Sequence, residues 1–338
     1  MKRIPSLDGL RAISIALVVA GHLGKSNHAP KIFWDVYAAL GVKIFFVISG
    51  YLITTILLRE HERTSDINLK EFYIRRAYRI FPAALVFMLI MFAAYWHQMR
   101  WYNMAAAMLY VANLDIHRPW ILGHLWSLSI EEQFYLAWPG VLKQWHRHRT
   151  AILLGVCALA PLCQVVFYWL KLDGGGPPTL PTVADNLAAG CLIAIFASRI
   201  PRIGRFAFWL MVVALLLIPL YSAHSVARTV FMLFVLRPLL HLSIAGVLVH
   251  VVQAPYRVLN WGPVVWLGQI SYSLYLWQQP FCSDPALRSG SLAGFAFICA
   301  ALSYYLVEQP VLRLREKRVP GAVKHPAALP DAPAIPAA

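Results

Sequence analysis

Two ionisable side chains in the first long apolar stretch of this sequence are spaced so that one helix face can carry both. Arg11 and His22 are separated by ten residues, and eleven helical steps place them on nearly the same face, roughly 16 Å apart along the axis. Imidazole titrates near neutral pH and can take a proton from an attacking hydroxyl. We therefore interpret His22 as a candidate catalytic base. The alternatives are that His22 ends a span at the lipid headgroups and that Arg11 extends to the interface.

A second group of ionisable residues lies in the segment LGHLWSLSIEEQFYLAWP (122–139). His124 and Glu131 are seven residues apart and share a helix face, whereas Glu132 is turned away by about 100°. Charged groups inside a bilayer are costly and are retained mostly where they face a cavity or a partner. We predict that Glu131 orients or charge-stabilises His22 in catalysis, and that His124 and Glu132 bind substrate. The alternative is a structural hydrogen-bonded pair between helices.

Three arginines enter the third apolar stretch, within FYIRRAYRIFP (72–82). Arg76 and Arg79 are i,i+3 neighbours that can share one anion, and guanidinium groups match phosphate oxygens well. The residues expected to bind the phosphates of a cytosolic donor are Arg11, Arg75, Arg76 and Arg79. The other interpretation is ordinary anchoring of a span by positive charge on its cytoplasmic side.

Lys43 is a further intramembrane charge, in the segment LGVKIFFVISGYLITT (40–55). We expect it to contribute to substrate binding by attracting an anion. Pairing with Glu131 or Glu132 is an equally good interpretation. The Ser-Gly pair at 49–50 in the same segment allows two helices to approach closely.

Gln278 lies in LGQISYSLYLWQQP (267–280), together with Tyr272, Tyr275 and Trp277. The aromatic residues are typical of the belt at a membrane interface. An amide can form hydrogen bonds but cannot shuttle a proton near pH 7. We therefore expect Gln278 to bind substrate and not to act as a base.

The composition places these residues in a membrane protein. Apolar residues make up 59% of the chain and charged residues only 13%, against about 25% charged residues in soluble domains. The net charge of +15 comes from short basic clusters between apolar runs, and a nucleic-acid-binding protein would present one basic stripe instead. The five cysteines have neither paired metal-ligand spacing nor a loop framework. We expect neither a nucleic-acid partner nor a metal.

Ten apolar runs are candidates for spans, since a span needs roughly 20 apolar residues. They cover approximately residues 8–24, 35–58, 79–97, 120–142, 150–171, 183–198, 206–221, 229–252, 261–282 and 290–309. With the N-terminus inside, twenty lysines and arginines lie on the cytoplasmic side and seven outside, as expected for cytoplasmic loops. The prediction is an all-α, polytopic membrane bundle of about ten helices with both termini in the cytoplasm.

Two segments fall outside this pattern of spans. Residues 104–115 are apolar but too short to cross a bilayer, so we predict a re-entrant or interfacial piece on the outer face. Residues 319–338 are rich in proline and alanine, and we predict a disordered cytoplasmic tail. The membrane domain therefore covers residues 1–318.

Six sequence motifs together resemble the membrane acyltransferase-3 family. They cover nearly the whole membrane part, in the family's order: SLDGLRA (6–12), FFVISGYLIT (45–54), FYIRRAYRIFP (72–82), HLWSLSIEEQFYL (124–136), SYSLYLW (271–277) and VEQP (307–310). Members of this family acylate sugars, polysaccharides, peptidoglycan or small molecules. Six ordered motifs are far more specific than any one of them.

The resemblance implies a ten-span bundle, a cytosolic acyl-CoA donor, commonly acetyl-CoA, and a histidine of the first span as the catalytic centre. Arg11, Arg76 and Arg79 match the arginines associated with the donor, and Glu131 lies in the glutamate motif. The sequence departs from the family where Gln278 replaces a common histidine. Lys43 stands where an acidic residue is frequent, which puts the acceptor in question.

The sequence thus predicts a multi-pass acyltransferase of the bacterial inner membrane that moves an acetyl or other acyl group from acyl-CoA to a hydroxyl of a carbohydrate acceptor. Whether His22 is a base or a covalent acyl carrier stays open. The main alternative is a transporter or flippase of a glycan or an anionic small molecule, which would predict an inverted repeat. A structural scaffold or sensor is a third interpretation.

Overall fold

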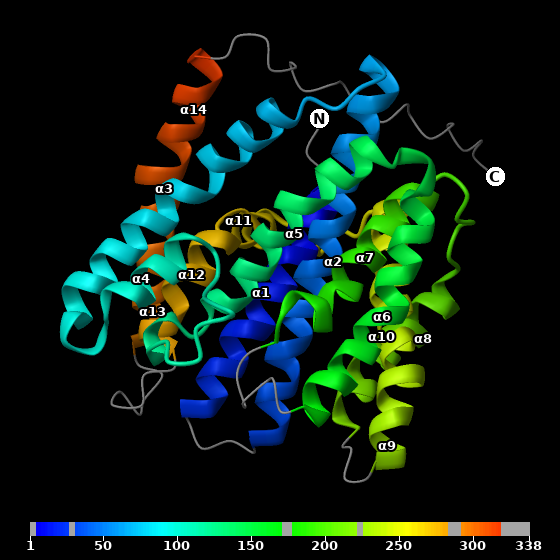
Figure 1. Cartoon of the computed structure of the whole chain (residues 1–338), viewed down its shortest axis with the longest axis horizontal. Coiled ribbons are helices and arrows are strands. Elements are labelled where there is room, and N and C mark those ends of the chain that lie inside the picture. Colours follow the sequence, from blue (N-terminus) through cyan, green and yellow to red (C-terminus); the bar gives the residue numbers. More distant parts are fainter. Residues whose placement is uncertain (1–4, 27–30, 171–177, 222–225, 283–291, 319–338) are drawn as a thin grey trace.

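A computed structural model of the 338-residue chain describes residues 5–26, 31–170, 178–221, 226–282 and 292–318 (Figure 1). All secondary structure within these ranges is helical, which confirms the predicted all-α class. The predicted tail at 319–338 and the basic residues Lys2 and Arg3 lie outside the described residues.

The helices follow one another with short connections. Their bounds are α1 (Pro5–Ser26), α2 (Lys31–Thr64), α3 (Leu69–Tyr95), α4 (Trp101–Met108), α5 (Leu125–Gln144), α6 (Arg149–Trp169), α7 (Leu180–Phe196), α8 (Arg205–Leu217), α9 (Val226–Phe231), α10 (Arg237–Gln253), α11 (Gly262–Gln269), α12 (Ser271–Cys282), α13 (Ala293–Ser303) and α14 (Gln309–Arg318). Two π-helical turns, Met232–Leu236 and Tyr304–Glu308, join α9 to α10 and α13 to α14.

Among the residues that the structure describes, six helical stretches are long and apolar enough to cross a membrane. They are Ser6–Gly24, Val36–Thr64, Leu69–Gln98, His146–Phe167, Ala227–Gln253 and Ala293–Arg315. The other four predicted spans coincide with helices that are shorter, more polar or interrupted. These are α5 with its two glutamates, α7 and α8, and the pair α11 and α12, which is interrupted at Ile270. The chain is therefore a multi-pass helical bundle, while ten crossings and cytoplasmic termini stay a prediction.

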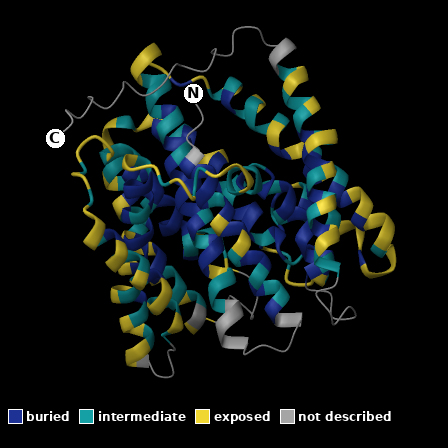
Figure 2. Cartoon of the chain, turned by 180° about the vertical axis from the view of Figure 1, so that it is seen from behind, coloured by how far each residue is buried: buried dark blue, intermediate teal, exposed yellow. Residues whose placement is uncertain are grey.

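The outer faces of the bundle are apolar, as contact with lipid requires. Large apolar side chains on α6 and α8 are exposed, among them Leu159, Leu162, Phe206, Trp209 and Leu210. Figure 2 shows the complementary pattern, with buried residues in the middle of the bundle and exposed ones on the peripheral helices. Soluble proteins rarely expose an apolar surface that extends over several helices, so this pattern supports a membrane location.

Helix α2 packs against α7 with the two backbones nearly in contact. A Cβ atom on Gly50 would lie 2.1 Å from the carbonyl oxygen of Leu187, and one on Gly190 would lie 2.0 Å from the carbonyl oxygen of Val47. Only glycine fits either position, as is common where membrane helices meet. The close approach predicted at 49–50 is confirmed.

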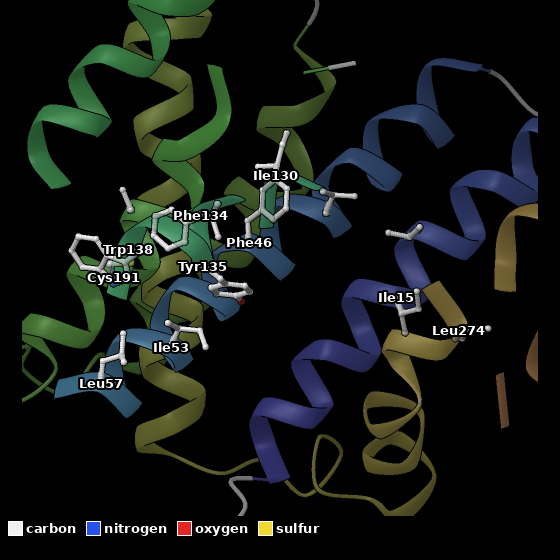
Figure 3. Close-up of a cluster of buried hydrophobic side chains, with 14 of the residues drawn as sticks. Ile15, Phe46, Ile53, Leu57, Ile130, Phe134, Tyr135, Trp138, Cys191 and Leu274 are labelled. Carbon is white, nitrogen blue, oxygen red and sulfur yellow. The ribbon is translucent and has the colours of Figure 1, made fainter. Parts of the chain in front are cut away.

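Helix α1 lies in the middle of the bundle, with α2 and α7 on one side and α12 on the other (Figure 1). Core side chains from α1, α2, α5, α7 and α12 converge beside it (Figure 3). Within this core Phe134 stacks on Trp138 with ring centroids 5.9 Å apart, and Trp138 donates its indole hydrogen bond to Thr54 at 2.9 Å. The packed core fixes the face that each of these helices presents to its neighbours.

The segment after α3 does not cross the bundle, in agreement with the prediction for 104–115. Helix α4 has only eight residues, and the following turn has Tyr110 at a left-handed φ of 54°. Side chains of α5 satisfy its backbone groups: Gln133 donates to the carbonyl of Tyr110 at 2.9 Å, and Ser129 accepts from the amide of Ala112 at 3.2 Å. Irregular backbone at membrane depth needs such partners.

Candidate active site

The candidate base and the first candidate donor arginine lie on one uninterrupted helix. Arg11 and His22 both belong to α1, so the separation of roughly 16 Å expected from helix geometry applies. Helices α3, α5 and α12 supply the polar side chains that surround α1. The site is therefore built around α1, from the end at Arg11 to the end at His22.

His22 is held by α12. Its Nδ1 lies 2.5 Å from Oε1 of Gln278, a residue that is completely buried. The substrate-binding role expected for Gln278 is not tested by this contact, but its position beside the imidazole is clear. No local pattern could predict this pairing, because the two residues are 256 positions apart in the chain.

His124 lies close to His22, immediately before α5. The imidazole is 4% exposed and packs edge-on against the rings of Phe87 and Tyr275, at centroid distances of 5.6 and 5.4 Å. It is within electrostatic range of His22. By strict hydrogen-bond geometry neither ring nitrogen has a partner among the described residues, but the backbone of Leu276 lies close enough to interact with the ring. His124 is therefore a buried polar group with spare hydrogen-bonding capacity, within electrostatic range of the candidate base.

Tyr275 connects this region to the middle of the bundle. Its hydroxyl lies 2.7 Å from the carbonyl oxygen of His124, to which it donates, and 2.5 Å from the hydroxyl of Ser127. It is also within electrostatic range of Glu131. The sequence indicated an interfacial belt for this tyrosine, whereas the structure places its hydroxyl in the polar interior.

Glu131 lies among polar side chains of α2, α3 and α5, and its predicted role beside His22 stays a prediction. Its Oε1 accepts hydrogen bonds from Ser49 at 2.5 Å and from Tyr135 at 2.7 Å, and Arg76 lies 3.8 Å away. The helix period correctly placed Glu131 on an interior face, but α2 and α3 supply its partners. Ser49 was noticed in the sequence only for its small size.

Glu132 forms the strongest ion pair of this region. Nη2 of Arg76 lies 2.6 Å from Oε1 of Glu132, and Nε lies 3.1 and 3.2 Å from the two carboxylate oxygens. The guanidinium also lies 3.4 Å from the centre of the Tyr135 ring. Arg76 is therefore neutralised by Glu132 and covered by an aromatic face.

The predicted donor arginines separate into two kinds. Arg75 forms ion pairs with Glu71 and, at 3.3 Å, with Glu60. Arg11 instead has one long contact, at 3.8 Å to Asp8, and lies within electrostatic range of Arg79. Among the residues described here, no carboxylate is within ion-pair distance of Arg79, which is exposed.

Glu308 lies near this end of the site. Buried Glu308 accepts a short hydrogen bond from Ser273. It is also within electrostatic range of Arg79. The α13–α14 junction therefore adds one carboxylate opposite the exposed arginine.

A series of polar side chains, each in hydrogen-bond contact or electrostatic range of the next, extends along α1, and we call it the polar file. Arg11 is within electrostatic range of Tyr135 and Glu131, and Tyr275 follows Glu131. The file then continues to the following residues, each in contact or electrostatic range of the one before: His124, His22 and Gln278.

Lys43 is not part of the polar file. Its electrostatic neighbours are Asp185 and Arg237, so the proposed pairing with Glu131 or Glu132 is wrong. Arg237 binds Asp185 with contacts of 2.5 and 2.6 Å, and the same region includes His241. Sequence reasoning missed this cluster, although an aspartate in the apolar run 183–198 was a usable signal.

A cavity of about 290 Å³ lies beside the Arg76–Glu132 pair, between α3, α5 and the turn after α4. Exposed apolar residues, Phe81, Leu109 and Leu136, are part of its wall. Its polar wall consists of Tyr73, Arg76, Tyr110, Glu132, Gln133 and Tyr135. The cavity therefore adjoins the polar file at the middle of α3, and His22 does not line it.

Cysteines and metal-ligand clusters add nothing to the site. All five cysteines are free thiols. In the ranges that the structure describes, no group of three His, Cys, Asp or Glu side chains is arranged to hold a metal ion.

The amino-acid sequence of the chain matches one family model and several known proteins. A family model described as an acyltransferase domain matches residues 4–307. A peptidoglycan O-acetyltransferase, OatA of Listeria monocytogenes serovar 1/2a (strain ATCC BAA-679 / EGD-e), is 30% identical over 92% of this chain and 56% of its own length. YrhL of Bacillus subtilis (strain 168), provisionally named as a peptidoglycan O-acetyltransferase, is 29% identical over 91% of this chain and 55% of its own length. No solved structure matches.

A third relative, from Staphylococcus aureus (strain COL), is provisionally named as an O-acetyltransferase and is 27% identical over 92% of this chain. The chain spans about half the length of the curated relatives it matches, from 55% to 57%. The similarity therefore concerns the helical part that these proteins share.

Proposed function

The chain belongs to the membrane acyltransferase-3 family, and on this premise we propose that it transfers an acetyl or other acyl group from acyl-CoA to a hydroxyl of a cell-envelope carbohydrate. We place it in the bacterial inner membrane, with α1 beginning at the cytoplasmic side. The observation that carries the proposal is the polar file. It joins an arginine pair at one end of α1 to an imidazole at the other end.

The donor end of the proposed site is the pair Arg11 and Arg79. Two like charges within electrostatic range repel each other, and a phosphate between them would remove that repulsion. Arg75 and Arg76 are already neutralised by carboxylates, so they border the donor path. CoA carries the phosphates that such a pair binds.

The path from the donor end to the reaction centre runs beside α1. The cavity of about 290 Å³ at the Arg76–Glu132 pair offers space for the arm that carries the acyl thioester. Glu131, held by Ser49 and Tyr135, keeps the middle of the path polar. Both features support a reaction in which donor and acceptor approach from different ends.

The reaction centre of the proposed mechanism is His22. The imidazole removes the proton of the acceptor hydroxyl, the hydroxyl oxygen attacks the thioester carbon, and the thiolate leaves with that proton. His124 and Glu132 remain the proposed substrate contacts, His124 beside the imidazole and Glu132 at the cavity. The names of the relatives favour a glycan acceptor such as peptidoglycan.

The test is acyl transfer by purified protein in proteoliposomes, measured by CoA release and by the mass of the acylated glycan. A positioned general base contributes about 10²- to 10⁴-fold to rate, so His22→Ala should lower the rate by that factor. His97→Ala is the matched control, because His97 is exposed at the end of α3. Full activity of His22→Ala would remove His22 from the mechanism.

The same assay distinguishes the rival function. A transporter or flippase would move the glycan across the membrane without releasing CoA. Glycan movement in the absence of CoA release, for every acceptor tried, would replace the acyltransferase proposal. An acyl group found covalently bound to His22 would instead assign it as an acyl carrier.

A further inference from the structure

Gln278 uses only half of its amide group in the structure. Its Oε1 lies 2.5 Å from Nδ1 of His22, whereas its Nε2 is buried and has no hydrogen-bond partner among the described residues. The residue is 0% exposed. A buried N–H without a partner costs free energy unless something present during function satisfies it.

The paired half of the amide determines which nitrogen of His22 is basic. An amide oxygen can only accept a hydrogen bond, so Nδ1 of His22 carries the hydrogen. In the neutral ring the lone pair is then on Nε2. A base oriented by a third group in this way is the usual arrangement for activating a hydroxyl.

The unpaired half of the amide lies beside the same ring. Oε1 and Nε2 belong to one planar group, so a donor at Nε2 is adjacent to the bond with His22. His124, whose ring nitrogens form no well-aligned hydrogen bond beyond the nearby backbone of Leu276, is within electrostatic range of His22 as well. Unused hydrogen-bonding atoms thus gather around the candidate base, as expected where a polar substrate belongs.

We propose that Gln278 acts through both atoms of its amide: Oε1 positions His22, and the Nε2 hydrogen stabilises the negative charge on the thioester carbonyl oxygen during acyl transfer. This inference rests on the proposed acyltransferase function. Donors aimed at a developing oxyanion are among the largest contributions to catalysis.

The acceptor hydroxyl gives its proton to Nε2 of His22, and its oxygen forms a bond to the thioester carbon. The carbonyl electrons move to oxygen, which accepts the hydrogen bond from Gln278. When the carbonyl re-forms, the carbon–sulfur bond breaks and the thiolate takes the proton from His22.

Three substitutions at Gln278 separate this role from packing. Histidine can accept at one ring nitrogen and donate at the other, so Gln278→His should keep kcat within about tenfold. Gln278→Met keeps the length but neither hydrogen bond, and should lower kcat by about 10²- to 10³-fold with little change in KM. Gln278→Glu keeps the acceptor but puts a negative charge where the oxyanion forms, so it should be no better than methionine.

A role in packing alone predicts the reverse order. Methionine and glutamate resemble glutamine in length and flexibility, so they would be tolerated, whereas the rigid imidazole would not. Near-native kcat in Gln278→Met or Gln278→Glu, or a loss confined to Gln278→His, would therefore overturn the proposal. Each variant is compared after its folded fraction has been measured by thermal unfolding in detergent.

Gln279→Leu provides the matched control on the same turn of α12. Gln279 is also buried, and its Nε2 donates to the carbonyl of Trp120 at 2.9 Å. Loss of this hydrogen bond should lower stability without the large fall in kcat.

Failure of the inference is distinguishable from failure of the proposed function. If His22→Ala is inactive and the order of the Gln278 variants is reversed, only the role of Gln278 is wrong. If His22→Ala is active, or the native protein acylates no acceptor, the proposed function is wrong and the inference falls with it.

Discussion

Two groups of charged side chains lie inside the helical bundle, and they differ in how completely their hydrogen-bonding atoms are used. The first joins α7 to α10, and we call it the closed cluster: Gln164, Thr182, Asp185, Asn186, Arg237 and His241. Arg237 donates to Gln164, to the carbonyl of Thr182 at 2.5 Å and to both oxygens of Asp185. No buried side-chain nitrogen or oxygen of these six residues is unsatisfied.

The polar file around α1 is different. Nε2 of Gln278 is buried and lacks a partner within the part of the chain that the structure describes, and the buried ring nitrogens of His124 form no well-aligned hydrogen bond there beyond the nearby backbone of Leu276. At the other end, Arg11 and Arg79 lie within electrostatic range of each other. The polar file therefore keeps unused hydrogen-bonding atoms at the His22 end and two neighbouring like charges at the Arg11 end, whereas the six residues of the closed cluster have neither.

The difference shows that charge inside a membrane protein does not by itself mark a functional site. A satisfied ion-pair network holds helices together, whereas unsatisfied buried groups are costly and need a compensating function. By this criterion we group Lys43, a neighbour of Asp185 and Arg237, with the closed cluster and not with the proposed reaction. Four tests examine the distinction.

The largest effect on stability is expected for Arg237→Leu. Removing one partner of a buried ion pair costs about 3–5 kcal/mol, because the other charge stays buried. Asp185 is 2% exposed, so unfolding of the purified variant in detergent should show this loss, while activity per folded molecule is retained.

The double variant with Asp185→Leu serves as the control, since removing both charges should restore most of the stability. If Arg237→Leu instead lost more than about tenfold in kcat while folded, a residue of the closed cluster would take part in the reaction, and the comparison would fail.

Arg79→Ala and Arg75→Ala form the next test, within one arginine motif. A hydrogen bond to a charged group contributes about 1.5–3 kcal/mol, so KM for acyl-CoA should rise roughly 10- to 100-fold in Arg79→Ala. Arg75 is already paired with Glu60 and Glu71, and the rise for its variant should be much smaller. Equal rises, measured by initial rates against acyl-CoA concentration, would contradict the division into paired and unpaired arginines.

His124→Phe should separate stability from activity. Phenylalanine keeps the edge-on packing against Phe87 and Tyr275. It also removes two buried nitrogens that lack well-aligned partners, which should raise the free energy of unfolding by about 1–2 kcal/mol. We expect a more stable protein with roughly tenfold lower activity, the common trade-off at functional sites. Unchanged activity with higher stability would show that His124 is a core aromatic residue.

The smallest effect on stability is expected at the Asp66–Lys143 pair. This exposed ion pair is a reference against which the effects at the buried groups can be compared. The hydrogen bond from Lys143, assisted by the backbone amide of Ile67, lowers the pKa of Asp66 below its ordinary value of 3.8. A lowered pKa in the folded state contributes stability above the unfolded value, and the contribution is lost as the pH falls through the folded value. Asp66 is fully exposed to solvent, so screening leaves little of it.

Asp66→Asn should therefore change the unfolding midpoint by an amount near the limit of measurement at neutral pH. The difference from the native protein should disappear in acid. A large change at pH 7 would mean that this connection between α2 and α3 matters as much as the buried groups.

Much of the architecture followed from the sequence. Composition and the lengths of the apolar runs predicted a multi-pass helical membrane protein, and the motifs identified the family. The helical period correctly placed Arg11 and His22 on one helix and turned Glu131 and Glu132 towards different partners. The short run at 104–115 was correctly excluded from the spans, because its length alone forbids crossing.

The number of crossings was less predictable. Four of the ten runs correspond to helices that are short, interrupted or, in α5, made more polar by the ion pair with Arg76. Hydropathy averages over such features, whereas a buried pair lets a helix carry charge inside the bundle.

The partners of the site residues were decided by the tertiary structure alone. Periodicity fixes which side chains share a face of one helix, but not which helix that face meets. Gln278, 256 positions from His22, is the side chain that contacts Nδ1 of the imidazole, where Glu131 was expected. Lys43 lies within electrostatic range of Asp185 instead of the glutamates. The residue types and their spacing determined a helical membrane bundle with ionisable groups along its central helix, and the packing of α5 and α12 beside that helix decided which groups meet.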